Sequence, residues 1–287
     1  MKKNTWLLDH AKNVYSQKGE DGILEEVLEV IKEGRGWCVE FGSWDGKHLS
    51  NTYNLMTKGW SGVFIEGSEE RHKESLETFA GNNKAHSICR FVDFEGNNTL
   101  DAILAETPIP KDFTMLSIDI DGNDYHIWES LCNYRPKVVV IEYNPSIPPN
   151  IEFIQPRDMS VNQGSSALAM VNLGKSKGYE LVSLTALNAI FVKKELYQLF
   201  EIADNSLEEM FVDRKNIMQI FQLYDGTLVL GGCGKLLWLD VPLNHAIQPI
   251  PKFLRLFPYS SDHWFRFTLF RILRKIIKFR EKLSSQK

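Results

Sequence analysis

Short apolar runs and amphipathic helical segments alternate along most of the chain, and this alternation limits the folds that the chain can adopt. The run Lys137–Tyr143 contains four consecutive β-branched residues, which is typical of a central parallel strand covered on both faces. Two later strands, Tyr179–Leu184 and Ala189–Val192, are joined by only four residues, so they must pair as an antiparallel hairpin. The sequence therefore predicts an α/β fold with a mostly parallel seven-stranded sheet and a final antiparallel hairpin.

The remaining segments give the expected organisation of the chain. Four further strands are expected at Trp37–Phe41, Ser61–Ile65, His86–Val92 and Phe113–Ile118. Helices are expected at 20–33, Glu69–Phe79, Thr99–Ala105, Asp124–Leu131, Ser165–Lys177 and Leu207–Lys215. We expect one domain over residues 1–260, followed by a separate tail over 261–287. The core of that domain covers about 36–193, and an extension covers about 200–260.

Composition excludes several classes of protein. The net charge of −4 over 287 residues gives no case for a nucleic-acid-binding protein, which would carry a basic face. The four cysteines form no CxxC pair and no zinc-like spacing with histidine, so we expect buried free thiols in a reducing compartment. The first ten residues lack the apolar segment of a signal peptide, and no apolar run approaches the roughly 20 residues of a membrane span. We therefore expect a cytoplasmic protein.

Acidic residues follow three of the expected strands, at the edge of a parallel sheet where ligands bind. The first strand ends at Glu40, before a glycine-bearing loop that lets a ligand approach the backbone. Glu66 ends the second strand, where an acid can hold the two hydroxyls of a ribose. Asp93 and Phe94 end the third, where they can bind and stack on adenine. Each acid alone could be a helix cap, but three at successive strand ends indicate an adenosine-containing ligand.

A second group of oxygen ligands is expected where the fourth and fifth strands end. Its members are Asp119, Asp121, Glu142 and Asn144. Carboxylates this close repel one another unless they are protonated, hydrogen-bonded or bound to a cation, and oxygen ligands suit Mg²⁺ or Mn²⁺. Such an ion would lower the pKa of an acceptor hydroxyl. The alternatives are that these acids cap the helix from Asp124, or that one of them is a metal-free base.

The expected catalytic residues are Asp119, Asp121 and His126. His126 lies just beyond the acidic group, and the pKa of a histidine suits proton transfer near neutrality. The other interpretation is structural, because a lone histidine on a helix is more often packed or solvent-facing than catalytic.

Three motifs in order give the chain a family resemblance. The first is Glu40–Gly46, which reads E-x-G-x-x-x-G, and the second is Ile118–Gly122, which reads I-D-x-D-G. Together with the upstream segment Tyr15–Asp21, they resemble the FkbM-type methyltransferases of the Rossmann-like class I S-adenosylmethionine-dependent fold, over residues 14–192. Two residues depart from that pattern. Trp44 replaces the middle glycine of the commonest loop, and Asp121 stands where glutamate is more usual.

The resemblance implies methyl transfer from S-adenosylmethionine to a sugar hydroxyl, on a sugar nucleotide, a polysaccharide or a glycolipid building block. It implies cofactor contacts from the first loop, the strand-end acids and the upstream segment. The expected cofactor residues are Ser16, Gln17, Glu40, Gly42, Ser43, Asp45, Gly46, Glu66, Asp93 and Phe94. Two other functions stay open at this point. One is a nucleotide-cofactor oxidoreductase, disfavoured by the missing G-x-G-x-x-G, and the other is a membrane-peripheral module without catalysis.

The C-terminal tail differs from the rest of the chain. Residues 262–287 hold eight Lys/Arg against two Asp/Glu, and apolar residues recur at alternating spacings of four and three from Phe265 to Leu283. This pattern predicts a basic amphipathic helix. Such a helix can lie on an anionic membrane, dock on the acidic body of its own chain, or form a contact between copies in a homo-oligomer.

Overall fold

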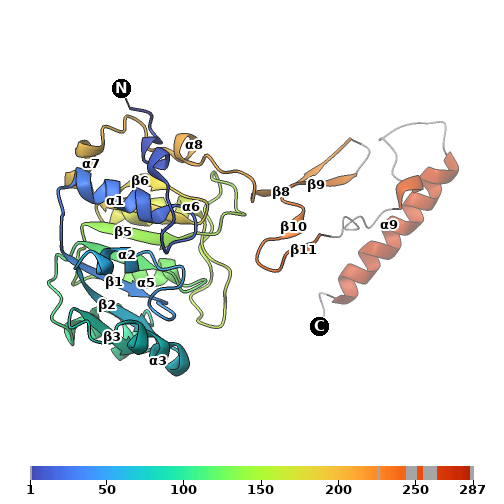
Figure 1. Ribbon diagram of the computed structural model, residues 1–287. Coiled ribbons are helices and arrows are strands. Elements are labelled where there is room, and N and C mark those ends of the chain that lie inside the picture. The colour runs from blue at the N-terminus through green and yellow to red at the C-terminus, as the bar shows by residue number, and fades with distance from the viewer. Residues whose placement is uncertain (1, 225–226, 244–250, 255–263, 285–287) are drawn as a thin grey trace. The chain divides into compact units, whose positions relative to one another are not determined.

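The computed structural model describes residues 2–224, 227–243, 251–254 and 264–284. Contacts divide the chain into two compact units (Figure 1), residues 1–214 and 215–287, which we call the core unit and the tail unit. The expected extension over 200–260 is therefore divided between them, and the division lies at Arg214 rather than near residue 260.

The core unit is built on one seven-stranded sheet in the order β3-β2-β1-β4-β5-β7-β6. Its strands are β1 (Trp37–Phe41), β2 (Ser61–Glu66), β3 (Ala85–Cys89), β4 (Met115–Ile118), β5 (Val138–Glu142), β6 (Tyr179–Leu184) and β7 (Asn188–Lys193). The strands from β3 to β5 in this order are parallel to one another, whereas β7 is antiparallel to both β5 and β6. This topology confirms the predicted fold class. The strand order reverses between β1 and β4, so the ligand site is expected at their carboxyl ends.

Helices cover both faces of this sheet. They are η1 (Trp6–His10), α1 (Glu20–Val30), α2 (Tyr53–Thr57), α3 (Glu69–Thr78), η2 (Gly96–Asn98), α4 (Leu100–Ala105), α5 (Asp124–Ser130), α6 (Ala167–Ser176), α7 (Lys194–Tyr197), η3 (Gln198–Phe200) and α8 (Leu207–Met210). Val138 and Val140 of β5 share a hydrophobic cluster with the apolar residues of α1. Val139 faces the other way and pairs with Phe191 of β7, whose ring lies 5.1 Å from that of Trp128 in α5. The continuous apolar run of β5 is therefore buried on both faces, as predicted.

Several boundaries differ from the sequence prediction. Strand β3, at the sheet edge, ends at Cys89, four residues before Asp93, which instead makes an isolated bridge to Thr99. Helix α8 is one turn long because Phe211 leaves helical geometry and is buried, with its ring 5.9 Å from that of Tyr143. All four cysteines are free, as expected, but only Cys38 is buried, and Cys89 and Cys132 are exposed.

The tail unit contains two small β-hairpins and one long helix. Its elements are β8 (Met218–Gln222), β9 (Leu228–Gly232), β10 (Lys235–Leu236), β11 (Val241–Pro242), η4 (Lys252–Leu254) and α9 (Trp264–Ser284). Helix α9 confirms the predicted helical tail; the remaining tail residues 262, 263 and 285–287 lie outside the described residues, as does Pro249 of the expected proline-stiffened loop. Among the residues that the structure describes, no helix has the length and apolar content to cross a bilayer.

Candidate functional site

The loop after β1 is shaped by two glycines. Gly42 has φ +67°, and a Cβ placed there would lie 1.8 Å from the carbonyl oxygen of Asp119. Gly46 has φ +79°, and its Cβ would lie 2.4 Å from Cε2 of Phe79. Both positions combine a left-handed backbone with close approach of a neighbour, so only glycine fits without strain. The contact at Gly42 also brings the carboxyl ends of β1 and β4 together.

Glu40 is buried at the end of β1 and holds the residues that follow the loop. Its Oε1 accepts a hydrogen bond from the Asn51 backbone N–H at 2.8 Å, and its Oε2 accepts from the hydroxyls of Ser50 at 2.5 Å and Thr52 at 2.8 Å. Burial raises the pKa of this carboxyl, and the three hydrogen bonds oppose the shift. Oε1 can accept one further bond, so Glu40 is able both to brace the loop and to receive a donor from a ligand.

The same loop is fastened to the end of β2. Glu66 accepts from the backbone N–H of Trp44 at 2.9 Å and of Ser68 at 2.8 Å, one bond on each carboxylate oxygen. The Ser43 hydroxyl donates to the carbonyl of Ile65 at 3.3 Å. These contacts hold Glu66 and Ser43 in place, and each Glu66 oxygen keeps a free lone pair toward a ligand hydroxyl.

Trp44, which stands where the resembled loop has its middle glycine, has φ +49°. The position therefore keeps a glycine-like backbone although it carries a large side chain, at a cost of about 1–3 kcal/mol. The ring is 44% exposed, with the guanidinium carbon of Arg71 4.3 Å from its centroid. Trp44 and Arg71 line an open depression of about 500 Å³, and its other lining residues are Asp45, His48, Glu74, Glu77 and Thr78. Asp45 itself accepts from the N–H groups of the next residues, Lys47 at 2.9 Å and His48 at 2.6 Å, and so closes a turn.

Asp93 and Phe94 lie in the loop beyond β3 rather than at its end. Oδ1 of Asp93 accepts from the N–H of Phe94 at 2.7 Å. The Phe94 ring contacts Arg157, whose guanidinium carbon is 4.7 Å from the ring centroid, and the ring of His126 is 5.9 Å away. Phe94 thus belongs to an aromatic and cationic group that the sequence did not predict.

Three carboxylates converge where β4 and β5 end. Asp119, Asp121 and Glu142 each offer an oxygen, and these oxygens all lie within 4.8 Å of one another. Burial, followed by the charges of Asp124 and Asp121, raises the pKa of Asp119 well above its ordinary value. Burial, followed by the charge of Asp119, raises the pKa of Glu142 to about 10. Three of the four predicted members are therefore brought together, and a bound proton or cation must neutralise part of their charge.

The turn that presents these acids is fixed by Asp124. Its Oδ1 accepts from the N–H of Ile120 and its Oδ2 from the N–H of Gly122, both at 2.9 Å. Asp124 thus ties back the turn before α5, and Asp121 in that turn has φ +56°, which Asp tolerates better than most residues.

The structure gives Asn144 other partners. Its Oδ1 accepts from the backbone N–H of Ser146 at 2.9 Å and from the Ser146 hydroxyl at 2.6 Å. Its Nδ2 donates to the carbonyl of Gln163 at 2.7 Å. These bonds organise the segment that follows β5, so the oxygen that was expected to join the acidic group serves a turn instead.

His126 is buried, and its contacts do not include the three carboxylates. Nε2 lies 2.9 Å from the carbonyl oxygen of Gln155, to which it must donate. Nδ1 has no hydrogen-bond partner among the described residues and lies 3.6 Å from Oε2 of Glu129. Gln155 also bonds the N–H groups of Gln163 and Gly164, so His126 helps to hold the segment between β5 and α6.

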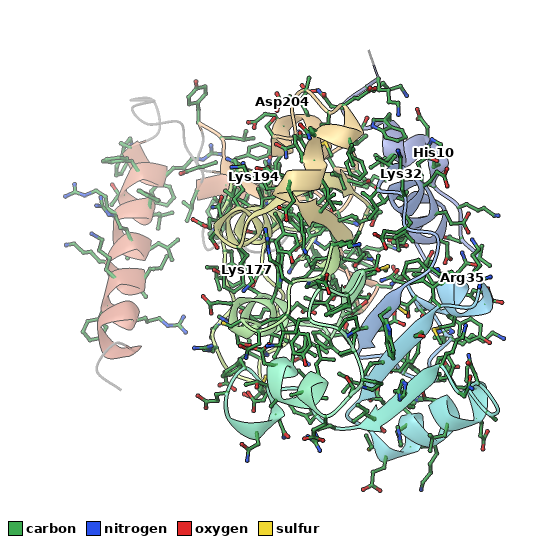
Figure 2. All side chains as sticks on the ribbon, turned by 90° about the vertical axis from the view of Figure 1, so that its left-hand side faces the viewer. His10, Lys32, Arg35, Lys177, Lys194 and Asp204 are labelled. Atoms are coloured by element: carbon green, nitrogen blue, oxygen red, sulfur yellow. The ribbon has the colours of Figure 1, made fainter. Side chains whose placement is uncertain are left out.

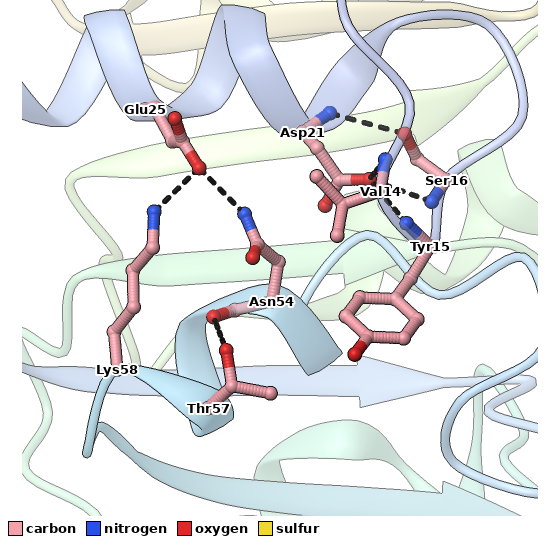
Figure 3. A network of polar contacts seen from close by, with 8 residues as sticks. All are labelled: Val14, Tyr15, Ser16, Asp21, Glu25, Asn54, Thr57 and Lys58. Carbon is pink, nitrogen blue, oxygen red and sulfur yellow. Dashed lines mark hydrogen bonds and ion pairs between the residues drawn. The ribbon is translucent and has the colours of Figure 1, made fainter.

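The segment before α1 folds around the carboxylate of Asp21 (Figure 3). Oδ2 of Asp21 accepts from three consecutive backbone N–H groups, those of Val14 at 2.8 Å, Tyr15 at 2.7 Å and Ser16 at 2.7 Å. The Ser16 hydroxyl accepts in turn from the N–H of Asp21 at 3.1 Å. Oδ1 of Asp21 is buried without a hydrogen-bond partner in the described structure, and the half-buried Gln17 side chain shows no hydrogen bond there.

Glu20 links the Tyr15–Asp21 segment to the hairpin of β6 and β7. Its fully buried carboxylate accepts from the Thr185 hydroxyl at 2.8 Å and from Nδ2 of Asn188 at 3.1 Å. Asn188 is the β7 partner of Glu142, and the charge of Glu20 contributes to the raised pKa of Asp119. Glu20 and Asp21 were not among the site residues expected from the sequence. Their place at the end of the Tyr15–Asp21 motif was the signal that could have marked them as site residues.

No family model matches the chain, and no curated protein matches it by sequence. Solved structures with partial likeness include magnesium protoporphyrin IX methyltransferase from Synechocystis PCC 6803 with bound SAM (TM-score 0.38, 11% identity, 61% of this chain and 79% of that chain). A SAM-dependent methyltransferase from Aquifex aeolicus gives a TM-score of 0.36 at 12% identity, over 58% of this chain and 86% of that chain. An S-adenosylmethionine-dependent methyltransferase from Clostridium acetobutylicum gives a TM-score of 0.41 at 11% identity, over 61% of this chain and 90% of that chain. With identities and scores this low, function has to be inferred from the residues of the site.

Proposed function

We propose that this chain is an FkbM-type, S-adenosylmethionine-dependent O-methyltransferase whose acceptor is a sugar hydroxyl. The observation that carries the proposal is the meeting of two predicted motifs at one point of the sheet. Gly42, in the first motif, lies against the carbonyl of Asp119, in the second, at the place where the strand order reverses. A cofactor on the β1 loop and an acceptor on the β4 and β5 acids would therefore lie side by side.

The acids around this point suit the charge of the cofactor. S-adenosylmethionine carries a sulfonium and an ammonium group, and both are cations. Glu40 and the orphaned Oδ1 of Asp21 are buried acceptors that could receive the ammonium group. Glu66 keeps acceptor capacity for the ribose hydroxyls. Ser43, Asp45 and Gly46 maintain the loop itself, so their contribution to cofactor binding is to keep its shape.

The carboxylates of Asp119, Asp121 and Glu142 also fit a divalent cation. They supply hard oxygen donors within 4.8 Å of one another, which is the donor chemistry that Mg²⁺ and Mn²⁺ prefer. When bound there, such an ion would polarise an acceptor hydroxyl and lower its pKa. Asp124 keeps the turn closed, so the donors would not have to reorganise when the ion binds.

Methyl transfer requires one bond to form and one to break. The acceptor oxygen attacks the methyl carbon, the carbon–sulfur bond breaks, S-adenosylhomocysteine leaves and the hydroxyl proton is released. A carboxylate of the Asp119, Asp121 and Glu142 group that is ionised when the acceptor binds would take up that proton. A carboxylate group of this kind also suits a sugar acceptor, whose neighbouring hydroxyls donate hydrogen bonds to carboxylates.

Calorimetry with the intact protein tests cofactor and cation separately. S-adenosylhomocysteine is titrated first with EDTA present and then with Mn²⁺, and NAD is titrated as a control. We expect S-adenosylhomocysteine to bind in both conditions and NAD in neither. Glu66→Ala should weaken nucleotide binding by about tenfold or more, because a buried-site hydrogen bond to a charged group contributes about 1.5–3 kcal/mol. Glu70→Ala, which removes an exposed acid, is the matched control and should bind S-adenosylhomocysteine like the wild type.

Mn²⁺ is then titrated into the wild type and into Asp119→Ala. Heat that disappears only in Asp119→Ala would support the cation site. Binding of NAD but not of S-adenosylhomocysteine would replace the proposal with an oxidoreductase, and binding of neither would contradict cofactor chemistry altogether. A sugar-nucleotide mixture with radiolabelled S-adenosylmethionine then tests the acceptor class, and label transferred to protein or RNA alone would refute the sugar hydroxyl.

A further inference from the structure

Helix α9 carries an apolar stripe that the described structure leaves open. Phe265, Ile272, Ile276 and Phe279 are spaced by seven, four and three residues, so they lie on one side of a helix with 3.6 residues per turn. Their exposed fractions are 60%, 51%, 52% and 64%. Figure 2 shows the side chains of α9 standing out from its ribbon. This stripe is too long and too exposed to be an ordinary scatter of surface apolar residues.

Around the helix, the apolar stripe lies between a partly covered row of side chains and a row of cations. Leu269, Leu273 and Ile277 lie beside it around the helix and are partly covered, and η4 packs against α9 with Leu254 buried. The rest of the helix circumference, up to the other flank of the stripe, carries the cations Arg271, Arg274, Lys275 and Lys278, all of them exposed. Within the described residues, no ion pair involves these four side chains. The described side chains of the helix therefore present apolar surface and positive charge at the same time.

We infer that α9 is a membrane-surface helix that binds anionic lipid bilayers. Its apolar stripe would enter the boundary between acyl chains and headgroups, while its cations face lipid phosphates. Charge complementarity decides in favour of a membrane over a protein groove. Helix α9 carries seven Lys/Arg against one Glu, spread along its length, and this suits a continuous anionic surface. Trp264, 75% exposed at the start of α9, is a side chain that favours the interface between water and lipid.

The inference is independent of methyl transfer, because none of the residues involved belongs to the core unit. Membrane binding through α9 would concentrate the chain near membrane-bound acceptors. A soluble acceptor would be methylated equally well with or without the membrane.

Co-sedimentation of the full chain with vesicles tests the inference. Vesicles of phosphatidylcholine are compared with vesicles in which about one lipid in three is phosphatidylglycerol. We expect binding to the anionic vesicles only, weakened by salt. The double variant Ile272→Asp with Ile276→Asp should abolish it, and Lys275→Glu with Lys278→Glu should weaken it roughly 25-fold or more. All four positions are exposed, so the core unit should stay folded.

Two variants in the core unit serve as matched controls. Leu76→Asp removes an apolar side chain that is 51% exposed on α3, and Lys73→Glu reverses an exposed charge on the same helix. Both should bind vesicles like the wild type. Equal binding to neutral and anionic vesicles, or unchanged binding of the Asp variants, would overturn the inference. Absence of binding, with a dimer in light scattering that these Asp variants dissociate, would assign the stripe to a second copy of the chain instead.

Discussion

The core unit and the tail unit of this chain differ in the sign of their net charge and in the exposure of their large apolar side chains. Residues 1–214 hold 21 Lys/Arg and 33 Asp/Glu, which gives a net charge of −12. Residues 215–287 hold twelve Lys/Arg and four Asp/Glu, which gives a net charge of +8. The core unit buries its large apolar side chains, with Trp128 and Phe191 at 0% exposure, while Trp264 and Phe279 of the tail unit are 75% and 64% exposed. Buried apolar surface stabilises a fold, and exposed apolar surface beside charge is available for binding.

This difference suggests a division of work within one chain. The acids of the core unit gather at one edge of the sheet, where they suit a cationic cofactor and a divalent ion. The cations of the tail unit extend along one helix, where they suit an extended anionic partner. The near-neutral total charge of −4 conceals both features.

The largest expected effect is on the free energy of unfolding, which a core variant should lower far more than a tail variant. Trp128→Ala empties a fully buried site between α5, α6 and β7 and should lower the free energy of unfolding by about 3–5 kcal/mol. Phe279→Ala truncates an exposed side chain and should change it by no more than about 0.5 kcal/mol. Chemical denaturation of both variants measures the contrast. Equal effects would mean that Phe279 is packed in solution.

The next effect separates the units by activity. Asp119→Asn removes a charge from the three-carboxylate group and should reduce methyl transfer on the order of 10²–10³-fold. Binding of S-adenosylhomocysteine should be nearly unchanged. The paired tail variant, Lys278→Glu, should leave the rate on a soluble acceptor at the wild-type value. A strong loss of rate in the tail variant would show that the tail unit takes part in catalysis.

A smaller effect concerns pH. The pKa of Glu142 in the folded chain is about 10 against an ordinary 4.5, so between these values the folded chain holds a proton that the unfolded chain has lost. This contribution to stability is complete below about pH 4.5 and is lost as the pH rises toward 10, by up to about 1.4 kcal/mol per pH unit. Thermal melts of metal-free protein from pH 6 to 9 measure this fall. Glu142→Gln should flatten the dependence, and a persistent slope in that variant would assign the proton to another group.

The smallest effect concerns Trp44. Replacement by glycine removes the strain of a positive φ, which stabilises the loop, and removes the contact with Arg71, worth about 0.5–1 kcal/mol. The two terms nearly cancel, so the melting temperature of Trp44→Gly should change little. Cofactor affinity is the sharper readout. Unchanged affinity would indicate that the ring lies outside the cofactor pocket, and weaker affinity would place it at the pocket wall.

Much of the fold could be predicted from the sequence because it depends on local patterns. The boundaries of β1 and β6 were predicted to the residue, and the short link before β7, predicted at four residues and three in the structure, fixed its antiparallel direction. The prediction failed where packing overrides propensity. The end of β3 is set by the edge of the sheet, and α8 stops where Phe211 turns into the core.

The candidate site, like the fold, could be predicted from the sequence only in part. Acids after strands could be found from the sequence because parallel strands deliver their carboxyl ends to one edge. The partners of those acids could not be found, because they come from distant segments. Glu40 meets residues 50–52, and Glu20 meets Thr185 and Asn188, more than 160 positions away.

By itself, the sequence determined the α/β sheet, the basic amphipathic helix and the set of acids that the sheet would gather, since periodicity and strand ends are local properties. Only the tertiary structure decided which of those acids share a site. It joined Asp119, Asp121 and Glu142, gave Asn144 to a turn, and tied His126 to Gln155. The physical reason is that a polar side chain takes the partner that the folded backbone brings within about 3 Å, and no local pattern records that partner.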